Sequence, residues 1–280
     1  MSNFILSAFA DEIDPKLDKQ IQVIQKHGIG YIELRSIEGK NVSEFTLDYA
    51  KETKKVLDAS NIKISAIGSP IGKIQIDDDF DKHLDLLKHV LEIAGIFETQ
   101  YIRLFSFYLP KGSDFDRYQN EVIEKMGKMA ETAKDYPITL LHENEKDIYG
   151  DIARRCYDIL SAINSPKLRA TFDPANFVQC GEKTYPEAYT LLKDYVEYIH
   201  IKDALYKDNS VVPAGQGDGC VKEIIDALKE DGFSGFLSLE PHLGNFAGFS
   251  NLETDLSNAP KELSDENKFA IAVNALKQLL

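Results

Sequence analysis

Short runs of apolar and β-branched residues recur along the whole chain. Eight such runs occur, at residues 4–11, 31–35, 62–69, 101–107, 138–143, 168–173, 196–203 and 236–240. Between them, apolar residues recur at a spacing of about three or four, as in Phe80, Leu84, Leu87 and Leu91. Short apolar runs are typical of buried strands, and the wider spacing is typical of amphipathic helices. The pattern therefore predicts eight strands that alternate with helices.

Alternation of strands and helices favours βαβ units and a parallel sheet. Eight such units in 280 residues predict an α/β protein with one (β/α)8 TIM barrel domain over residues 1–280, since this fold takes about 250 residues. A doubly wound sheet is the alternative. It normally has fewer strands and a glycine-rich phosphate turn after the first one, which this chain lacks.

The predicted connections differ at the two ends of the strands. Turns from a helix into a strand are short and contain Gly, Pro or Asn, whereas connections at 36–46, 69–79, 107–117, 204–220 and 241–262 are long. Long loops are uncommon unless they are functional, and in a barrel these loops share the face where active sites are found. The longest, 241–262, is interpreted as a lid, an oligomer contact that would make the protein a homo-oligomer, or a plain surface loop.

Charge and composition exclude several classes of protein. The chain has 46 acidic and 32 basic side chains and a net charge of −14, which opposes a nucleic-acid partner and an anionic membrane surface. Its three cysteines lie far apart without a CxxC motif, as expected for reduced thiols of a cytoplasmic protein. The sequence shows no signal peptide and no apolar stretch that could span a membrane.

Four consecutive predicted strands end with a carboxylate or an imidazole. These residues are Glu143, Asp173, His200 and Glu240. Together they suit one divalent cation that accepts oxygen and nitrogen ligands, such as Mn, Zn, Co or Mg. Acids after strands are also common as helix caps or turn residues, and no local motif such as HExxH defines the geometry. Spacing alone leaves both interpretations open.

Further polar residues lie at or near the predicted strand ends and are weaker candidates for substrate contacts. They are Glu33, Arg103, Glu145, Lys202 and His242. Lys202 and Arg103 equally fit structural salt bridges. The glycine-rich stretch 215–219 is expected to form a tight loop whose N–H groups could meet an anion. Among the other histidines, His142 is expected to face away from the barrel axis, and His83 and His89 to lie at the surface of a helix.

Seven segments of the chain resemble the sugar phosphate isomerase/epimerase group of the xylose isomerase-like TIM barrels. They are SAFADEID at 7–14, GIGYIELRSIEGKNV at 28–42, SPIGKI at 69–74, HENEKDIYGD at 142–151, TFDPANFVQ at 171–179, YIHIKDA at 198–204 and FLSLEPH at 236–242. The resemblance implies one divalent metal ion held by Glu143, Asp173, His200 and Glu240. Some epimerases of the superfamily have a His where this chain has Asn176, which could still donate to a substrate hydroxyl.

The resemblance also implies proton transfer at a carbon next to a carbonyl, in a small carbohydrate: a sugar, a sugar phosphate or a related polyol ketone. Glu143 and Glu240 are then expected to act as acid and base around an enediolate. Inosose-type dehydration on the same scaffold is the closest alternative. Hydrolysis of DNA in the manner of endonuclease IV is opposed by the net charge and by only six histidines. A non-catalytic sugar-binding barrel is opposed by the intact set of ligands.

Overall fold

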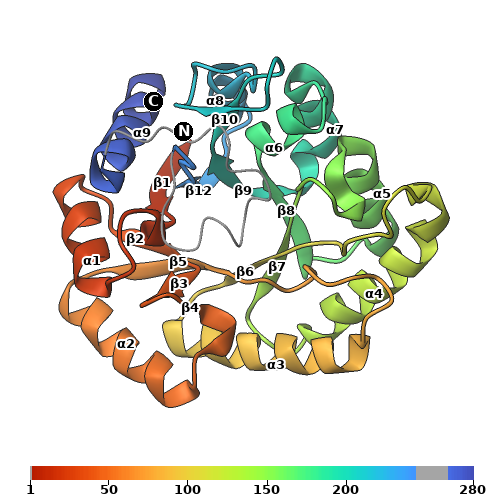
Figure 1. The fold of residues 1–280 in the computed structure, drawn as a ribbon, viewed down its shortest axis with the longest axis horizontal. Coiled ribbons are helices and arrows are strands. Elements are labelled where there is room, and N and C mark those ends of the chain that lie inside the picture. The colour runs from red at the N-terminus through yellow and green to blue at the C-terminus, as the bar shows by residue number, and fades with distance from the viewer. Residues whose placement is uncertain (1, 244–263) are drawn as a thin grey trace.

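The chain forms a barrel of parallel strands surrounded by helices (Figure 1). The computed structural model describes residues 2–243 and 264–280. Within them, one sheet of eight strands has the order β1-β12-β9-β8-β7-β6-β5-β2. Its strands are β1 (Asn3–Ala8), β2 (Tyr31–Leu34), β5 (Lys63–Gly68), β6 (Tyr101–Leu104), β7 (Thr139–Glu143), β8 (Leu168–Phe172), β9 (Val196–Ile201) and β12 (Ser234–Leu239). The end strands β1 and β2 lie next to each other, so the barrel is nearly closed.

A helical segment follows every strand and packs on the outside of the barrel (Figure 1). The helices are α1 (Leu17–Lys26), α2 (Leu47–Ala59), α3 (Phe80–Phe97), α4 (Gln119–Thr132), α5 (Ala153–Ile163), α6 (Pro174–Gln179), α7 (Tyr189–Leu192), α8 (Val221–Glu230) and α9 (Asp265–Leu279). In α3, Asp79 caps the first turn through Lys82 N–H, and Leu87 and Leu91 are buried. Burial of such stripes against the strands holds the helices in place.

The predicted TIM barrel is therefore confirmed, and each of the eight apolar runs overlaps one of its strands; β1 and β12 begin one and two residues before their runs. The run 196–203 is longer than β9 because Asp203 and Ala204 form a separate short strand, β10 (Asp203–Ala204). β10 pairs antiparallel with β11 (Val211–Val212) in the loop after β9. A similar hairpin of β3 (Ser36–Ile37) and β4 (Lys40–Asn41) lies in the loop after β2.

The two ends of the barrel differ as predicted. Turns into strands are tight: Gly28, at φ +73°, ends α1 in a left-handed conformation that favours glycine. The long connections follow the carboxyl ends of the strands and contain the two hairpins. Residues 244–262 of the predicted lid or oligomer contact lie outside the described residues.

His83 corrects one prediction from the sequence. It is buried, with 6% of its surface exposed, rather than on the surface of α3. Its Nε2 accepts the N–H of Gly72 at 2.8 Å. Gly72 has φ +87°, and a Cβ there would lie 2.0 Å from the carbonyl oxygen of Phe105. The histidine thus anchors a loop that already packs tightly against the chain after β6, a contact that helical spacing cannot reveal.

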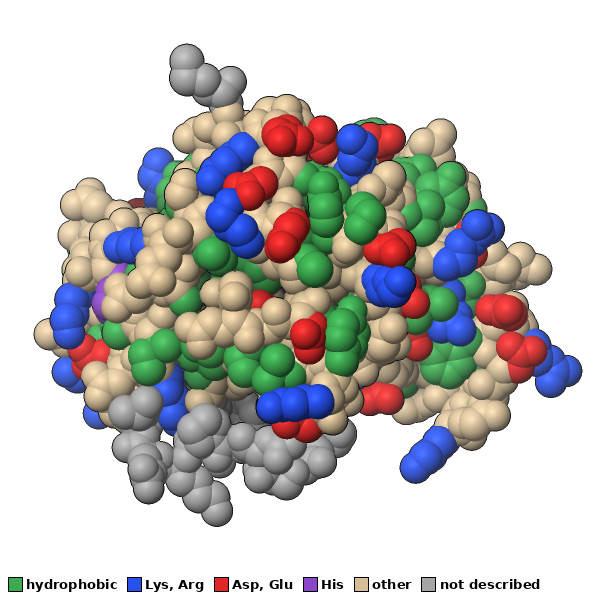
Figure 2. Space-filling model, turned by 90° about the horizontal axis from the view of Figure 1, so that it is seen from above, with side chains coloured by type: hydrophobic (Ala, Val, Ile, Leu, Met, Phe, Trp, Pro, Cys, Tyr) green, Lys and Arg blue, Asp and Glu red, His purple; other side chains and the backbone are tan. Residues whose placement is uncertain are grey.

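Charged side chains are mixed over the surface. On the face in Figure 2, acidic and basic side chains are interspersed and do not gather into a basic patch. Many are pairs within one helix, such as Lys54 with Asp58 in α2 and Lys128 with Glu124 in α4. Among the described residues, no helix is both long and apolar enough to cross a membrane.

Candidate metal centre

Four polar side chains reach one end of the barrel from four neighbouring strands. Glu143 is the last residue of β7, and His200 lies in β9. Asp173 directly follows β8, and Glu240 directly follows β12. All four are buried. Because β7, β8, β9 and β12 are adjacent and parallel, their carboxyl ends bring these side chains to one rim.

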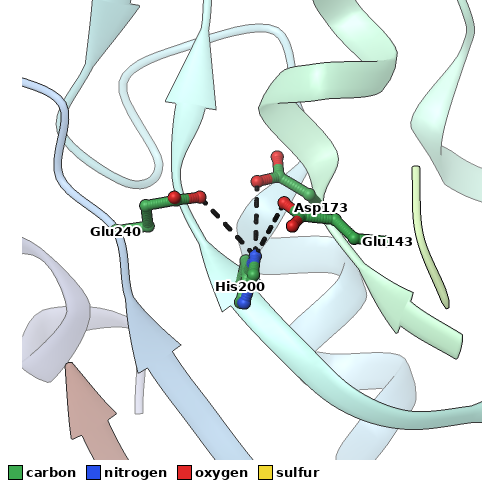
Figure 3. Close-up of side chains that lie close together, drawn as sticks. All are labelled: Glu143, Asp173, His200 and Glu240. Carbon is green, nitrogen blue, oxygen red and sulfur yellow. Dashed lines mark hydrogen bonds and ion pairs between the residues drawn. The ribbon is translucent and has the colours of Figure 1, made fainter. Parts of the chain in front are cut away.

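The imidazole of His200 lies at the centre of this group (Figure 3). Its Nδ1 lies 2.9 Å from Glu143 Oε1, 3.5 Å from Glu240 Oε2 and 3.8 Å from Asp173 Oδ2. Atoms bonded to one ion at about 2.0–2.3 Å lie no more than about 4.6 Å apart. The four residues offer atoms that all lie within 4.8 Å of one another, so that small shifts of the side chains bring them to this spacing. Their spacing and chemistry therefore fit one divalent cation.

Asp173 uses its two oxygens differently. Oδ1 accepts the N–H of Asn176 at 2.9 Å and so caps α6, in which Pro174 occupies the first turn. Oδ2 is buried and takes no part in the cap; its close polar contact is the Lys202 ammonium at 3.1 Å. An oxygen held by an ion pair alone can also accept a metal ion. The helix-cap and metal-ligand interpretations of Asp173 are thus compatible.

Buried cations contact the carboxylates. Arg103 Nε lies 3.1 Å from Glu143 Oε2. Lys202 Nζ lies 3.1 Å from Asp173 Oδ2 and 3.0 Å from Glu240 Oε2. Of the two interpretations of Lys202 and Arg103, the structure therefore shows the salt bridges. Each cation favours the ionised form of its partner in a region from which water is largely removed.

A second ion-pair network adjoins Glu240 and was not predicted. Arg35 extends its guanidinium to Asp11 at 2.8 Å, to Glu12 at 3.2 Å and to Glu240 Oε1 at 3.2 Å. His242 Nε2 lies 3.3 Å from Glu12 Oε1 and 3.5 Å from Glu240 Oε1. Asp11 and Glu12 follow β1, so the rule that selected the other strand-end acids would have found them if it had been applied to the first strand.

The charged neighbours set the protonation of the carboxylates. Burial alone would raise the pKa of Glu143, but His200 and Arg103 outweigh it and lower the pKa to about 2. Burial dominates at Asp173 and raises its pKa to about 7, although Lys202 opposes it. The pKa of Glu240 lies well below its usual range because Lys202 and the two histidines outweigh burial. Glu143 and Glu240 are therefore ionised near neutral pH.

Two asparagines position the carboxylates. Asn176 Nδ2 donates to Glu143 Oε1 at 3.2 Å and to the carbonyl of Asn144 at 2.9 Å. The Asn144 amide in turn exchanges two hydrogen bonds of 2.9 Å with the backbone of Asp173. Asn176, predicted to bind substrate, thus contacts a candidate ligand directly. Asn144 was missed, although it directly follows Glu143 at the end of β7.

The remaining predicted residues fall into different environments. Glu33 is fully buried and contacts His200 on the side away from the three carboxylates. Glu145 lies farther out, where its carboxylate pairs with Lys73 at 3.3 Å beside a cavity that both residues line. His142 faces away from the metal candidates, as predicted: its Nε2 lies 3.0 Å from Ser106 Oγ, and burial lowers its pKa to about 4.

The glycine-rich loop holds an anion that belongs to the chain itself. The carboxylate of Asp203 accepts the N–H groups of Gly215, Gly217 and Gly219 at 2.8–2.9 Å. It also accepts the N–H of Ala204 at 2.9 Å. The loop is tight and exposes N–H groups to an anion, as the sequence predicts, but these donors are already used.

The fold has counterparts in known proteins. A family model described as the xylose isomerase-like TIM barrel matches residues 21–268. The chain belongs to this family. A curated relative, the uncharacterized protein MJ1311 of Methanocaldococcus jannaschii, is 22% identical over 165 residues. The chain spans about half the length of that relative, since the match covers 56% of each.

Solved structures of this superfamily share the fold. The IolI protein with a bound zinc atom is 16% identical, with a TM-score of 0.77 over 99% of this chain and 97% of that one. D-allulose 3-epimerase from Methylomonas sp. is 16% identical, with a TM-score of 0.76 over 100% and 99%. The probable 3-DHS dehydratase AsbF from Bacillus anthracis is 15% identical, with a TM-score of 0.73 over 99% of both. At these identities the likeness concerns the fold.

Proposed function

We propose that the protein is a divalent-metal-dependent isomerase or epimerase of a small polyhydroxylated ketone or aldehyde. The observation that carries this proposal is the convergence of three carboxylates on Nδ1 of His200, at the end of the barrel where this fold places its active sites. Membership in a family whose solved relatives include an epimerase supports it. Glu143, Asp173, His200 and Glu240 would hold the cation.

A divalent cation at this position supplies Lewis acidity toward a carbonyl and its neighbouring hydroxyl oxygen. The protein supplies the proton transfer. Glu143 and Glu240 approach His200 from different sides (Figure 3), and both are ionised, so either can remove the proton next to the carbonyl and become a carboxylic acid. That acid can return the proton, or the other glutamate can deliver one after it has taken a proton from water. Return to the opposite face of the same carbon gives an epimer. Return to the neighbouring carbon gives an isomer.

The cations of the rim suggest that the substrate is not phosphorylated. Arg35, Arg103, Lys202 and Lys73 are each paired with a carboxylate. The loop donors that resemble a phosphate cradle are taken by Asp203. A substrate phosphate would therefore have to displace existing ion pairs at a considerable cost. We expect kcat/KM to be higher for a free ketose than for its phosphate.

Dehydration is the second candidate, and Lys202 is the observation that favours it. Loss of water next to a carbonyl requires a proton donor for the departing hydroxyl. The Lys202 ammonium lies among the carboxylates within 3.0 Å of Glu240 and can donate. The fold similarity to AsbF is consistent with this reaction. Formation of an α,β-unsaturated ketone, followed by ultraviolet absorbance, separates dehydration from isomerisation.

The test uses protein loaded with Mn²⁺ and a panel of ketoses in deuterated water. We expect exchange of the proton next to the carbonyl, followed by NMR, for at least one sugar. Glu240→Gln should slow exchange by about 100-fold or more. Glu197→Gln, which alters a carboxylate of β9 that pairs with Arg169, is the matched control and should exchange normally. Undiminished exchange in Glu240→Gln would exclude Glu240 as an essential acid or base.

A further inference from the structure

The Nε2 side of the His200 imidazole, opposite the three carboxylates at Nδ1, contacts a further carboxylate, that of Glu33. Glu33 Oε1 and Oε2 lie 3.2 Å and 3.1 Å from His200 Nε2. Both side chains have no exposed surface, so solvent and substrate do not reach this contact. Because an ionised carboxylate can only accept, Nε2 is the donor. Nδ1 faces the three carboxylates and, beside the ionised Glu143, is a donor as well; when a cation takes the place of the proton on Nδ1, the ring proton that remains is the one that Glu33 holds on Nε2.

A β-bulge next to Glu33 shifts the pairing of β2 with β5 by one residue. Ile32 of β2 pairs with Ile64 of β5, but the next residue, Glu33, pairs with Ala66, so Ser65 is an additional residue in β5. Ser65 Oγ donates to the carbonyl of Ile32 at 3.2 Å. Bulges of this kind change the direction and height of side chains and occur next to active sites. Here the bulge accompanies the register at which Glu33 meets His200.

The aromatic neighbours of His200 fix the plane of its ring but not which of the two nitrogens faces the rim. Phe9 and Tyr198 meet His200 edge to face, with ring centroids 5.3 Å and 5.9 Å away. Such packing holds the plane of an imidazole but does not distinguish its two nitrogens. The hydroxyl of Tyr198 points to Ser65 Oγ at 2.8 Å. Only a polar partner such as Glu33 determines which nitrogen carries the proton and which faces the rim.

We propose that Glu33 is a positioning residue that prepares His200 Nδ1 to bind a divalent cation. The inference rests on the proposed metal-dependent function and assigns Glu33 no contact with substrate. A carboxylate that accepts the second N–H of a metal-binding histidine fixes its tautomer and orientation and increases its basicity. Loss of such a partner typically lowers metal affinity by about 10–100-fold.

The experiment measures Co²⁺ binding to the full chain by calorimetry and by its visible absorption spectrum. Glu33→Gln keeps a carbonyl acceptor but removes the charge, and we expect its Kd to rise by about 10-fold. Glu33→Leu removes both and should raise Kd by about 100-fold and change the Co²⁺ spectrum. Thr184→Val is the control: it also removes a buried polar group, but the hydrogen bond of that hydroxyl goes to the carbonyl of Gly219, so its Kd and spectrum should match the wild type.

A Kd for Glu33→Gln within about twofold of the wild type would overturn the inference. If Glu33→Leu does not fold, Glu33→Gln alone serves as the test. An equal loss in Thr184→Val would also overturn it, because the effect would then come from general damage to the packing of the protein. Failure of the wild-type protein to bind Co²⁺, Mn²⁺ or Zn²⁺ would instead remove the proposed function, and the inference with it. Circular dichroism of each variant verifies the fold.

Discussion

Lys202 Nζ lies 3.1 Å from Asp173 Oδ2, the oxygen that faces His200 Nδ1 and is not used in capping α6. The same ammonium group lies 3.0 Å from Glu240 Oε2. A permanent cation of the chain thus contacts the oxygens that a metal ion would take. Lys202 balances their charge when no metal is bound and would share them with the cation when one is.

Replacement of Lys202 with Met should destabilise the metal-free protein by about 3–5 kcal/mol, because it leaves buried carboxylates without their counter-ion. Mn²⁺ should then raise the Tm of the variant more than that of the wild type, since the ion supplies the missing charge. Thermal unfolding with EDTA and with Mn²⁺ measures both effects. Lys88→Met, at an exposed pair with Asp85, is the control and should leave the Tm nearly unchanged. Equal gains from Mn²⁺ would contradict the prediction.

The two functions of Asp173 can be separated by substitution. Asn at this position can still cap α6, but it replaces the carboxylate oxygen that faces His200, so Mn²⁺ affinity should fall more than about 100-fold. Ala removes both functions and should cost about 1 kcal/mol more than Asn in the free energy of unfolding. Calorimetry and urea unfolding provide the two readouts. Normal Mn²⁺ binding by Asp173→Asn would show that Asp173 caps α6 and is not a metal ligand.

His83 should make stability depend on pH. Burial lowers its pKa below the ordinary value of 6.5, so the unfolded chain binds the proton first as pH falls. Stability from this group is then full above about pH 6.5, is lost as pH falls through that value, and levels off below the folded pKa. Urea unfolding between pH 5 and 8 should show a smaller loss for His83→Gln. An unchanged slope in His83→Gln would refute the assignment.

The loop around Asp203 should not tolerate a side chain at Gly217. A Cβ there would lie 2.3 Å from Asp203 Oδ1 and 2.5 Å from the carbonyl of Ala204, whereas a Cβ at Gly127 in α4 would meet nothing within 4 Å. Gly217→Ala should therefore destabilise the protein by about 1–3 kcal/mol. Gly127→Ala should stabilise it by about 0.5–1 kcal/mol through helix propensity. Urea unfolding of both variants tests the contrast, and equal effects would count against it.

Local patterns were sufficient for the architecture and for the candidate ligands. Period-two and longer apolar spacings reflect the pleat of a strand and the turn of a helix, which depend on neighbours in sequence. Glu143, Asp173, His200 and Glu240 could be selected because each lies at the end of an apolar run. In parallel strands that position alone indicates a common rim.

The direction and partners of the other polar side chains could not be read in this way. Glu33 was predicted to touch substrate and lies buried beneath His200, because the bulge at Ser65 and the closing of the barrel decide what it meets. His83 lies on a helix with the expected spacing, yet the loop at Gly72 covers it.

The sequence by itself determined an acidic eight-stranded TIM barrel with four candidate ligands at its strand ends, because local periodicity and parallel connectivity depend on neighbouring residues. Only the tertiary structure decided the charge balance of the site: Lys202, Arg103 and Arg35 with the candidate carboxylates, and Asp203 in the glycine loop. Such pairs join residues that are distant in sequence, and their distances depend on strand register and barrel closure. Neither strand register nor barrel closure produces a pattern among neighbouring residues of the sequence.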